Sequence, residues 1–280
     1  TNKNQSKQSN YSIDFDGSTA THVGIGEVIG GPFFPGGGTY TSNVTVQNPK
    51  FSGSAFINFD TNLTGIVGNI VGVGVTGGAS AWFLRKNASN NIEFTVRTDA
   101  GPPFYATVTG STVLSPNQWY HAAFSWNGNT ITLYLNGSVD GSVSATKFYN
   151  SSFQYSGWAS IGSYWRGGSN ITTLWVGQID GVSIFDYALS ASQVTTLYGS
   201  SSTGIGNPMS LSPKPFAYYP LGTSAWNGNY LAENNAIGDY IFNFDDTSPE
   251  DYISASVTTL NSATQCTISF WGKKDASNKK

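Results

Sequence analysis

The segment WYHAAFSWNGNTITLYLNG at residues 119–137 constrains the fold more than any other part of this chain, because its pattern is that of a β-hairpin. Apolar residues at 131, 133 and 135 alternate with Thr130, Thr132 and Tyr134, as expected for a strand with one buried face. Asn127-Gly128 supplies the positive φ that a tight hairpin turn needs, and a second turn follows at Asn136-Gly137. The chain therefore folds back on itself repeatedly, which predicts an antiparallel sheet.

The composition supports an all-β protein and excludes two classes of partner. Charged residues are only 10% of the 280 residues, against roughly a quarter in an average soluble domain. The formal net charge of −3 provides no basic surface for a polyanion, so nucleic acid is not an expected partner. No apolar run approaches the roughly 20 residues of a membrane span, so no membrane insertion is predicted. Cys266 is the single cysteine, which excludes an intramolecular disulfide.

Short apolar runs separated by Gly, Asn and Pro turns continue along the chain, and their number favours a β-sandwich. Strands are predicted at residues 12–15, 55–60, 66–75, 81–85, 92–98, 105–109, 119–126, 130–135, 158–162 and 176–185. One helix is expected after them, because Ser190 and Gln193 have the spacing of a capping box and Gly199 can end the helix.

An internal repeat indicates more than one domain. Residues 11–16, YSIDFD, match residues 240–245, YIFNFD, and each match is followed by polar turn residues. Residues 1–10 are predicted as a tail or the end of an upstream segment, and residues 11–199 as the first domain. Residues 200–215, rich in Ser, Gly and Pro, are predicted as a linker. Residues 216–280, which start with FAYYPLG, are predicted to be the N-terminal part of a second, incomplete copy.

Several motifs in the first domain resemble one protein family. They are Trp119-Tyr-His, Trp126-Asn-Gly, LYLNG at 133–137, Ile161-Gly-Ser163 and GQIDGVSIFDYALS at 177–190. In content and order they resemble the laminin-G-like, concanavalin A-like lectin/glucanase superfamily. The resemblance implies an all-β jelly-roll sandwich of two antiparallel sheets. Tandem copies of such a domain, joined by a linker of this kind, also resemble structural proteins of tailed phages and marine viruses.

The chain lacks the residues that catalysis in this superfamily requires. Its glucanase branch carries Glu-x-Asp-x-x-Glu on one strand, which sets two carboxylates on one sheet face. Here the glutamates are scattered, at Glu27, Glu93, Glu233 and Glu250. The chain has two histidines and no Gly-x-Ser-x-Gly nucleophile elbow. A non-enzymatic protein with no catalytic residues is therefore predicted.

Calcium is the one candidate cofactor. The resemblance implies it, since family members bind calcium near sheet ends through aspartates and backbone carbonyls. Asp16, in a Phe-Asp-Gly turn, and Asp180, in Gln-Ile-Asp-Gly, occupy family-like positions and are the candidate metal ligands. The alternative is that each carboxylate accepts hydrogen bonds from turn amides.

A sugar ligand needs an aromatic plate for the apolar ring face and planar polar groups for the hydroxyls. Tyr164, Trp165 and Arg166 offer this combination on a Gly-flanked loop, so they are the candidate ligand-binding residues. Packing of Trp165 against a neighbouring domain is the alternative.

The leading hypothesis is a virion or cell-surface structural protein that acts in attachment or surface decoration. Its location would be the virion surface or the extracellular space. Its partners would be other virion or surface proteins, copies of itself, and a glycan. The alternative hypothesis is a carbohydrate-binding module of a secreted polysaccharide-degrading enzyme whose catalytic domain lies outside this segment.

Overall fold

The fold is described from a computed structural model for residues 12–19, 21–28, 33, 35, 44–75, 80–99, 102–150, 157–165, 171–199 and 206–221. The chain divides into two compact units, residues 1–223 and 224–280, and all described residues belong to the first. The predicted second copy from residue 224 onward therefore lies outside the described residues. No helix in the described part of the chain is long and apolar enough to cross a membrane.

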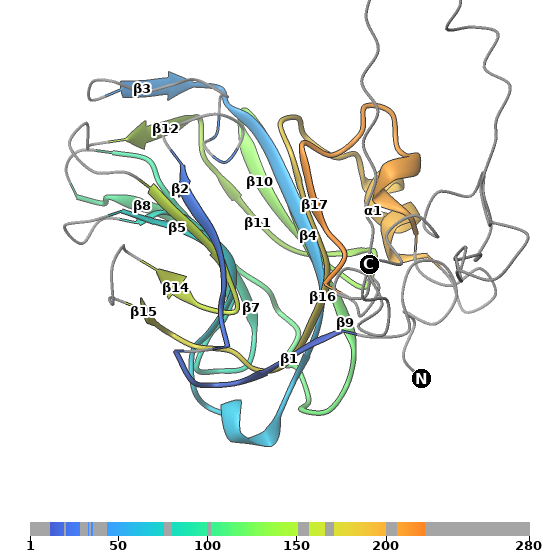
Figure 1. The fold of residues 1–280 in the computed structure, drawn as a ribbon. Coiled ribbons are helices and arrows are strands. Elements are labelled where there is room, and N and C mark those ends of the chain that lie inside the picture. The colour runs from blue at the N-terminus through green and yellow to red at the C-terminus, as the bar shows by residue number, and fades with distance from the viewer. Residues whose placement is uncertain are drawn as a thin grey trace, which may run out of the picture. The chain divides into compact units, whose positions relative to one another are not determined.

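Two antiparallel sheets dominate the first unit, as predicted (Figure 1). In the described residues the seven-stranded sheet has the order β1 (Ile13–Asp16), β16 (Val176–Phe185), β4 (Lys50–Phe59), β9 (Tyr120–Asn127), β10 (Thr130–Leu135) and β11 (Ser138–Ser144), with β17 (Ala217–Tyr219) also paired to β16. The six-stranded sheet has the order β2 (Val23–Val28), β13 (Gly157–Ile161), β5 (Gly68–Val75), β6 (Ser80–Lys86), β7 (Ile92–Arg97) and β8 (Tyr105–Thr109). Two short pairs, β3 (Val44–Gln47) with β12 (Lys147–Asn150) and β14 (Tyr164–Trp165) with β15 (Ile171–Thr172), lie beside them.

The hairpin predicted from residues 119–137 is confirmed as β9 and β10. Their register pairs Trp126 with Ile131 and Phe124 with Leu133, so the alternating apolar side chains share the inner face. Gly128 has a φ of 100°, which an L-residue would adopt only with strain. Local alternation and turn chemistry are therefore sufficient to form this element.

An aromatic cluster joins the two sheets at the centre of the core. Phe124 from β9 stacks on Phe94 from β7 with ring centroids 3.9 Å apart. Trp82 from β6 packs against Phe51 and Phe124 from the opposite sheet, at 5.0 and 5.8 Å. All four side chains are completely buried. Burial of each contributes roughly 1.5–3 kcal/mol, so this cluster stabilises the contact between the sheets.

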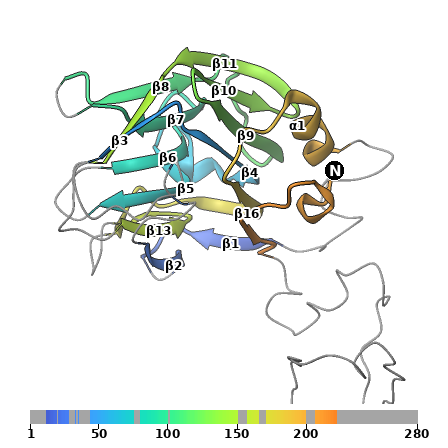
Figure 2. The ribbon, with the colours of Figure 1, turned by 90° about the horizontal axis from the view of Figure 1, so that it is seen from above.

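The outer face of the seven-stranded sheet is covered. Helix α1 (Ala191–Tyr198) begins at the predicted capping box, in which Ser190 Oγ accepts from Gln193 N at 3.2 Å and Gln193 Oε1 accepts from Ser190 N at 2.9 Å. Val194 and Leu197 of the helix pack with Ala123 and Phe185 of the sheet. Figure 2 shows α1 on the side of β9 and β16 that faces away from the six-stranded sheet. The sandwich thus has one covered outer face.

Residues 206–221 belong to the first unit, which differs from the predicted boundary at residue 199. Strand β17 pairs with β16 through Val182–Tyr219 and Ile184–Ala217, next to the part of β16 that pairs with β1. Leu221 is buried in the main core. The segment AYY therefore extends the first sheet, because its backbone groups find partners on β16. The first unit ends at residue 223.

Candidate functional site

An open groove of about 460 Å³ lies on the outer face of the six-stranded sheet. Strands β5 to β8 form its floor, and β14 with the residue after β15 forms one side. Its lining residues are Asn69, Phe83, Arg85, Thr95, Tyr105, Thr107, Tyr164 and Thr173. The volume is within the range of small-ligand sites in proteins.

Strand register places the groove residues in rows across the sheet. Phe83 on β6 pairs with Thr95 on β7, which pairs with Thr107 on β8. Gly72 is opposite Phe83 on β5, and a Cβ at Gly72 would lie 2.8 Å from Phe83 Cβ. The missing side chain at Gly72 therefore makes room for the Phe83 side chain on this face.

Aromatic rings stand at two sides of the groove. Phe83 and Tyr164 meet edge to face, with ring centroids 6.1 Å apart and an interplanar angle of 69°. Tyr105 lies two strands from Phe83 and two residues along, so their Cα atoms are about 12 Å apart. Because Tyr105 is 36% exposed, its ring can meet a ligand. A ligand longer than one sugar ring can contact both aromatic positions, so the groove can hold an oligomeric ligand.

A charged pair and a pair of hydroxyls occupy the floor. Arg85 Nε donates to Glu93 Oε1 at 2.7 Å, and Arg85 Nη2 donates to the same oxygen. The Arg85 guanidinium also lies over the Phe83 ring, 4.5 Å from its centroid. Beside the pair, the Oγ1 atoms of Thr95 and Thr107 are 3.0 Å apart. The floor therefore presents fixed donors and acceptors next to an apolar ring.

The structure separates the sequence-predicted ligand residues. Tyr164 lines the groove. Trp165, the next residue on β14, instead packs against Trp158 at 4.5 Å and His22 at 5.6 Å between ring centroids. Arg166 lies outside the described residues. The structure thus brings only the first of the three to the groove within its described part.

Sequence analysis missed Phe83, Arg85, Glu93 and Tyr105. A local signal existed for the first three, because Phe83 and Arg85 alternate with the core residues Trp82 and Leu84. An arginine and a glutamate at outward positions of neighbouring strands suggest a cross-strand pair. Tyr105 had no comparable signal.

The candidate calcium ligands are not brought together by the strand register. Asp16 pairs with Val176 on β16. Asp180 lies four residues farther along the same strand, about 13 Å from Val176. The exposed Asp16 carboxylate accepts from Ser18 N at 2.8 Å and Thr21 Oγ1 at 2.7 Å, and these hydrogen bonds lower its pKa. Asp180 is buried on β16, opposite Phe56 on β4. A calcium ion shared by the two carboxylates does not fit this arrangement.

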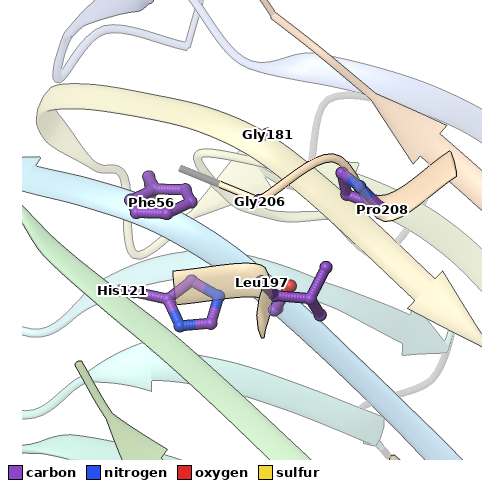
Figure 3. A pocket seen from close by; sticks show the side chains of 7 residues that line it. Phe56, His121, Gly181, Leu197, Gly206 and Pro208 are labelled. Atoms are coloured by element: carbon purple, nitrogen blue, oxygen red, sulfur yellow. The ribbon is translucent and has the colours of Figure 1, made fainter. Parts of the chain in front are cut away.

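A small cavity of about 10 Å³ lies under α1 and residues 206–208, on the covered face of the other sheet (Figure 3). His121, Phe56, Leu197 and Pro208 contribute to its lining. The volume is close to the minimum for a single water molecule, so the cavity is too small for an organic ligand. Burial lowers the pKa of His121 to about 3, which keeps its imidazole neutral.

Comparison with solved structures finds several that are similar to this chain. A proposed carbohydrate-binding protein from Bacteroides ovatus superposes with a TM-score of 0.50 at 22% identity, covering 78% of this chain and 53% of that chain. A heptameric SAP-like pentraxin from Limulus polyphemus gives 0.47 at 15% identity, covering 74% and 89%. The CBM40 of the Ruminococcus gnavus IT-sialidase gives 0.49 at 14% identity, covering 68% and 97%.

The likeness to the Bacteroides ovatus protein supports a shared fold and carries no argument about ligands. A comparison with curated proteins gives no match. The sequence itself matches one family over residues 35–195, more than half of the chain, which includes strands β4 to β16 and most of α1. The chain belongs to the concanavalin A-like lectin/glucanases superfamily.

Proposed function

We propose that this chain binds a carbohydrate in the groove and does not hydrolyse it. The observation that carries the proposal is the combination of exposed and half-buried aromatic rings with fixed hydroxyl and guanidinium groups on a sheet face that no described segment covers. Aromatic rings stack on the apolar face of a sugar, and the polar groups bond to its hydroxyls. Membership of a superfamily that contains lectins agrees with this chemistry.

The lining of the groove argues against hydrolysis. A glycosidase needs two carboxyl groups about 5–9.5 Å apart across the scissile bond. None of the eight lining residues carries a carboxylate. Glu93, next to them, accepts both hydrogen bonds from Arg85 through one oxygen. The described groove thus offers binding groups without an acid and nucleophile pair.

Substitution of Tyr105 tests the proposal directly. Tyr105→Ala removes an exposed ring, and we expect about tenfold weaker binding to glycans identified on an array, about 1.4 kcal/mol. Tyr105→Phe keeps the ring and should retain most of the affinity. Phe216→Ala, which removes a half-exposed ring that does not line the groove, is the location control. Affinity is measured by isothermal titration calorimetry.

Tyr164→Ala provides a second, independent test at the other side of the groove. We expect a similar loss, because Tyr164 contacts Phe83 and borders the same cavity. If Tyr105→Ala and Tyr164→Ala both bind glycans as tightly as the wild type does, the groove is not the binding site.

Both kinds of protein predicted from the sequence can contain a glycan-binding domain. In a virion or cell-surface structural protein it would act in attachment, and in a secreted polysaccharide-degrading enzyme it would hold the enzyme on its substrate. We favour the first kind on the tandem arrangement predicted from the repeated YSIDFD and YIFNFD segments. Capsid or tail genes beside this one would support it, whereas a hydrolase domain in the same chain would support the second.

A further inference from the structure

We infer that the groove selects uncharged oligosaccharides and disfavours glycans that carry carboxylates or sulfates. This inference rests on the proposed function and adds the class of ligand. The observation behind it is the charge of the groove floor, where the single charged lining residue of the described groove, Arg85, is already paired with Glu93.

The geometry of the pair holds the Arg85 guanidinium in place beside a compensating carboxylate. Nε and Nη2 both donate to Oε1 of Glu93, while the guanidinium rests on the Phe83 ring. The Glu93 side chain is only 11% exposed, and its second oxygen lies 3.5 Å from Thr109 Oγ1. Glu93 holds one edge of the Arg85 guanidinium and the Phe83 ring supports one face. The guanidinium therefore cannot turn toward an incoming anion without breaking these contacts.

An anionic ligand would also find no compensating positive charge among the described lining residues. Next to the groove, Glu93 offsets the charge of Arg85, so the pair presents no net positive charge to a carboxylate. The other seven lining residues are Asn, Thr, Phe and Tyr, which are uncharged side chains at neutral pH. At the described lining residues a carboxylate would lose its hydration and gain no counter-charge.

One further cation lies on the same sheet face. Arg97 pairs with Tyr105 across β7 and β8, and its guanidinium lies 5.7 Å from the Phe104 ring centroid and 5.3 Å from that of Tyr149. Its Nε donates to Asp99 O at 3.3 Å. Because Arg97 is held by these rings and does not line the groove, it does not supply an anion site there.

The polar groups on the groove floor can recognise the hydroxyl groups of a sugar. Arginine has five N–H donors, so those not directed at Glu93 can donate to sugar hydroxyl oxygens. Thr95 and Thr107 each carry a hydroxyl that both donates and accepts. This mixture of donors and acceptors beside aromatic rings matches a neutral sugar, whose hydroxyls also do both.

The test compares matched pairs of glycans on the full chain. Each pair consists of a neutral oligosaccharide and the same oligosaccharide with a terminal sialic acid, a uronic acid or a sulfate. We expect the neutral member to bind about tenfold or more tightly, with little change between 50 and 500 mM NaCl, because no net charge is engaged.

The variant Glu93→Gln should shift this preference. Glutamine keeps the shape of the side chain but removes the charge that compensates Arg85, so the preference for the neutral member should fall or reverse. Binding by the variant should also become sensitive to salt. Thr109→Val, which touches Glu93 without changing charge, is the control and should keep the wild-type preference.

The outcomes separate the two proposals. If the wild type prefers the anionic members and loses affinity in salt, the inference is overturned while glycan binding in the groove stands. If the wild type binds neither class, the proposed function fails and the inference fails with it. The salt dependence of the wild type decides the question even if Glu93→Gln does not fold.

Discussion

His121 should make the stability of this domain depend on pH between 7 and 5. The side chain is 1% exposed, and neither ring nitrogen has a hydrogen-bond partner among the described residues. Phe56 lies 4.7 Å and Tyr198 6.1 Å from the imidazole, between ring centroids. On β16, Asp180 is the carboxylate in the same cross-strand row, two strands away, at about 10 Å. The surroundings therefore favour neutral imidazole.

The magnitude follows from the two pKa values of His121. Burial lowers the folded-state pKa from 6.5 to about 3, so at pH 5 the folded protein still holds neutral imidazole. The unfolded chain, with a pKa near 6.5, is almost fully protonated at pH 5. The contribution of neutral His121 to stability is thus fully present above pH 6.5 and is lost as pH falls toward 3. Between pH 7 and pH 5 the free energy of unfolding should drop by about 2 kcal/mol from this residue alone.

Urea unfolding at pH 7, 6 and 5, followed by far-ultraviolet circular dichroism, measures this loss. His121→Phe replaces the imidazole with a ring of similar size that carries no titrating group and no polar atoms left without a partner, so its stability should change little over this range. His22→Gln removes the other histidine of the chain, so comparison of the two variants isolates the contribution of His121. A His121→Phe variant that loses stability between pH 7 and pH 5 as steeply as the wild type would refute the reasoning.

Two further substitutions test local features of the fold. Gly162→Ala should lower the melting temperature by several degrees, because its φ is 75° and a Cβ would lie 2.2 Å from Phe15 Cε1. Gly65→Ala is the matched control, since Gly65 has a φ of 74° but open space around its Cβ, so it should show the smaller cost of φ strain alone. Ser190→Ala removes the capping box of α1 and should cost about 1 kcal/mol in urea unfolding, whereas an unchanged midpoint would show that packing alone holds the helix.

Elements with a strong local signal were predictable from the sequence. The β9–β10 hairpin has alternation and an Asn-Gly turn, and α1 has a capping box, so both are specified by neighbouring residues. Strand β11 lacked such a signal, because Ser138–Ser144 is mostly polar and pairs at the edge of its sheet. Its strand conformation is determined by pairing with β10, which is a tertiary contact.

The position of residues 216–221 illustrates a different limit. The motif AYYPLG predicts the first strand of a new domain, because it follows a Gly- and Pro-rich segment. In the structure Ala217–Tyr219 pairs with β16, and Phe216 N donates to Ile184 O at 2.8 Å. A strand motif predicts that a segment will pair with another strand. Which strand becomes the partner depends on the sheet edge that is available.

The groove required the same long-range information. Outward positions on β6 and β7 could be identified by alternation, but Tyr105 reaches the site through the order of the strands in the sheet. Tyr164 reaches it through the separate β14–β15 pair, which packs beside β5. Tyr164 is a candidate on the sequence alone because aromatic residues on a Gly-flanked loop are poorly explained by core packing. The same reasoning applied to Trp165, whose partners Trp158 and His22 come from other segments. Composition of a loop therefore cannot separate a groove residue from a packed one.

The location of the groove follows from a difference between the two outer faces. On the seven-stranded sheet, small side chains at Ser52 and Ser125 face outward and bond to the backbone of Tyr187 and Leu189, which draws the chain before α1 across that face. On the six-stranded sheet the outward positions hold Phe83, Arg85 and Glu93, which satisfy one another within the sheet. A covering segment there would have to desolvate an ion pair and gain no backbone bonds in return. The large, mutually satisfied side chains thus leave this face open among the described segments, and an open face with fixed rings and donors is what a glycan can use.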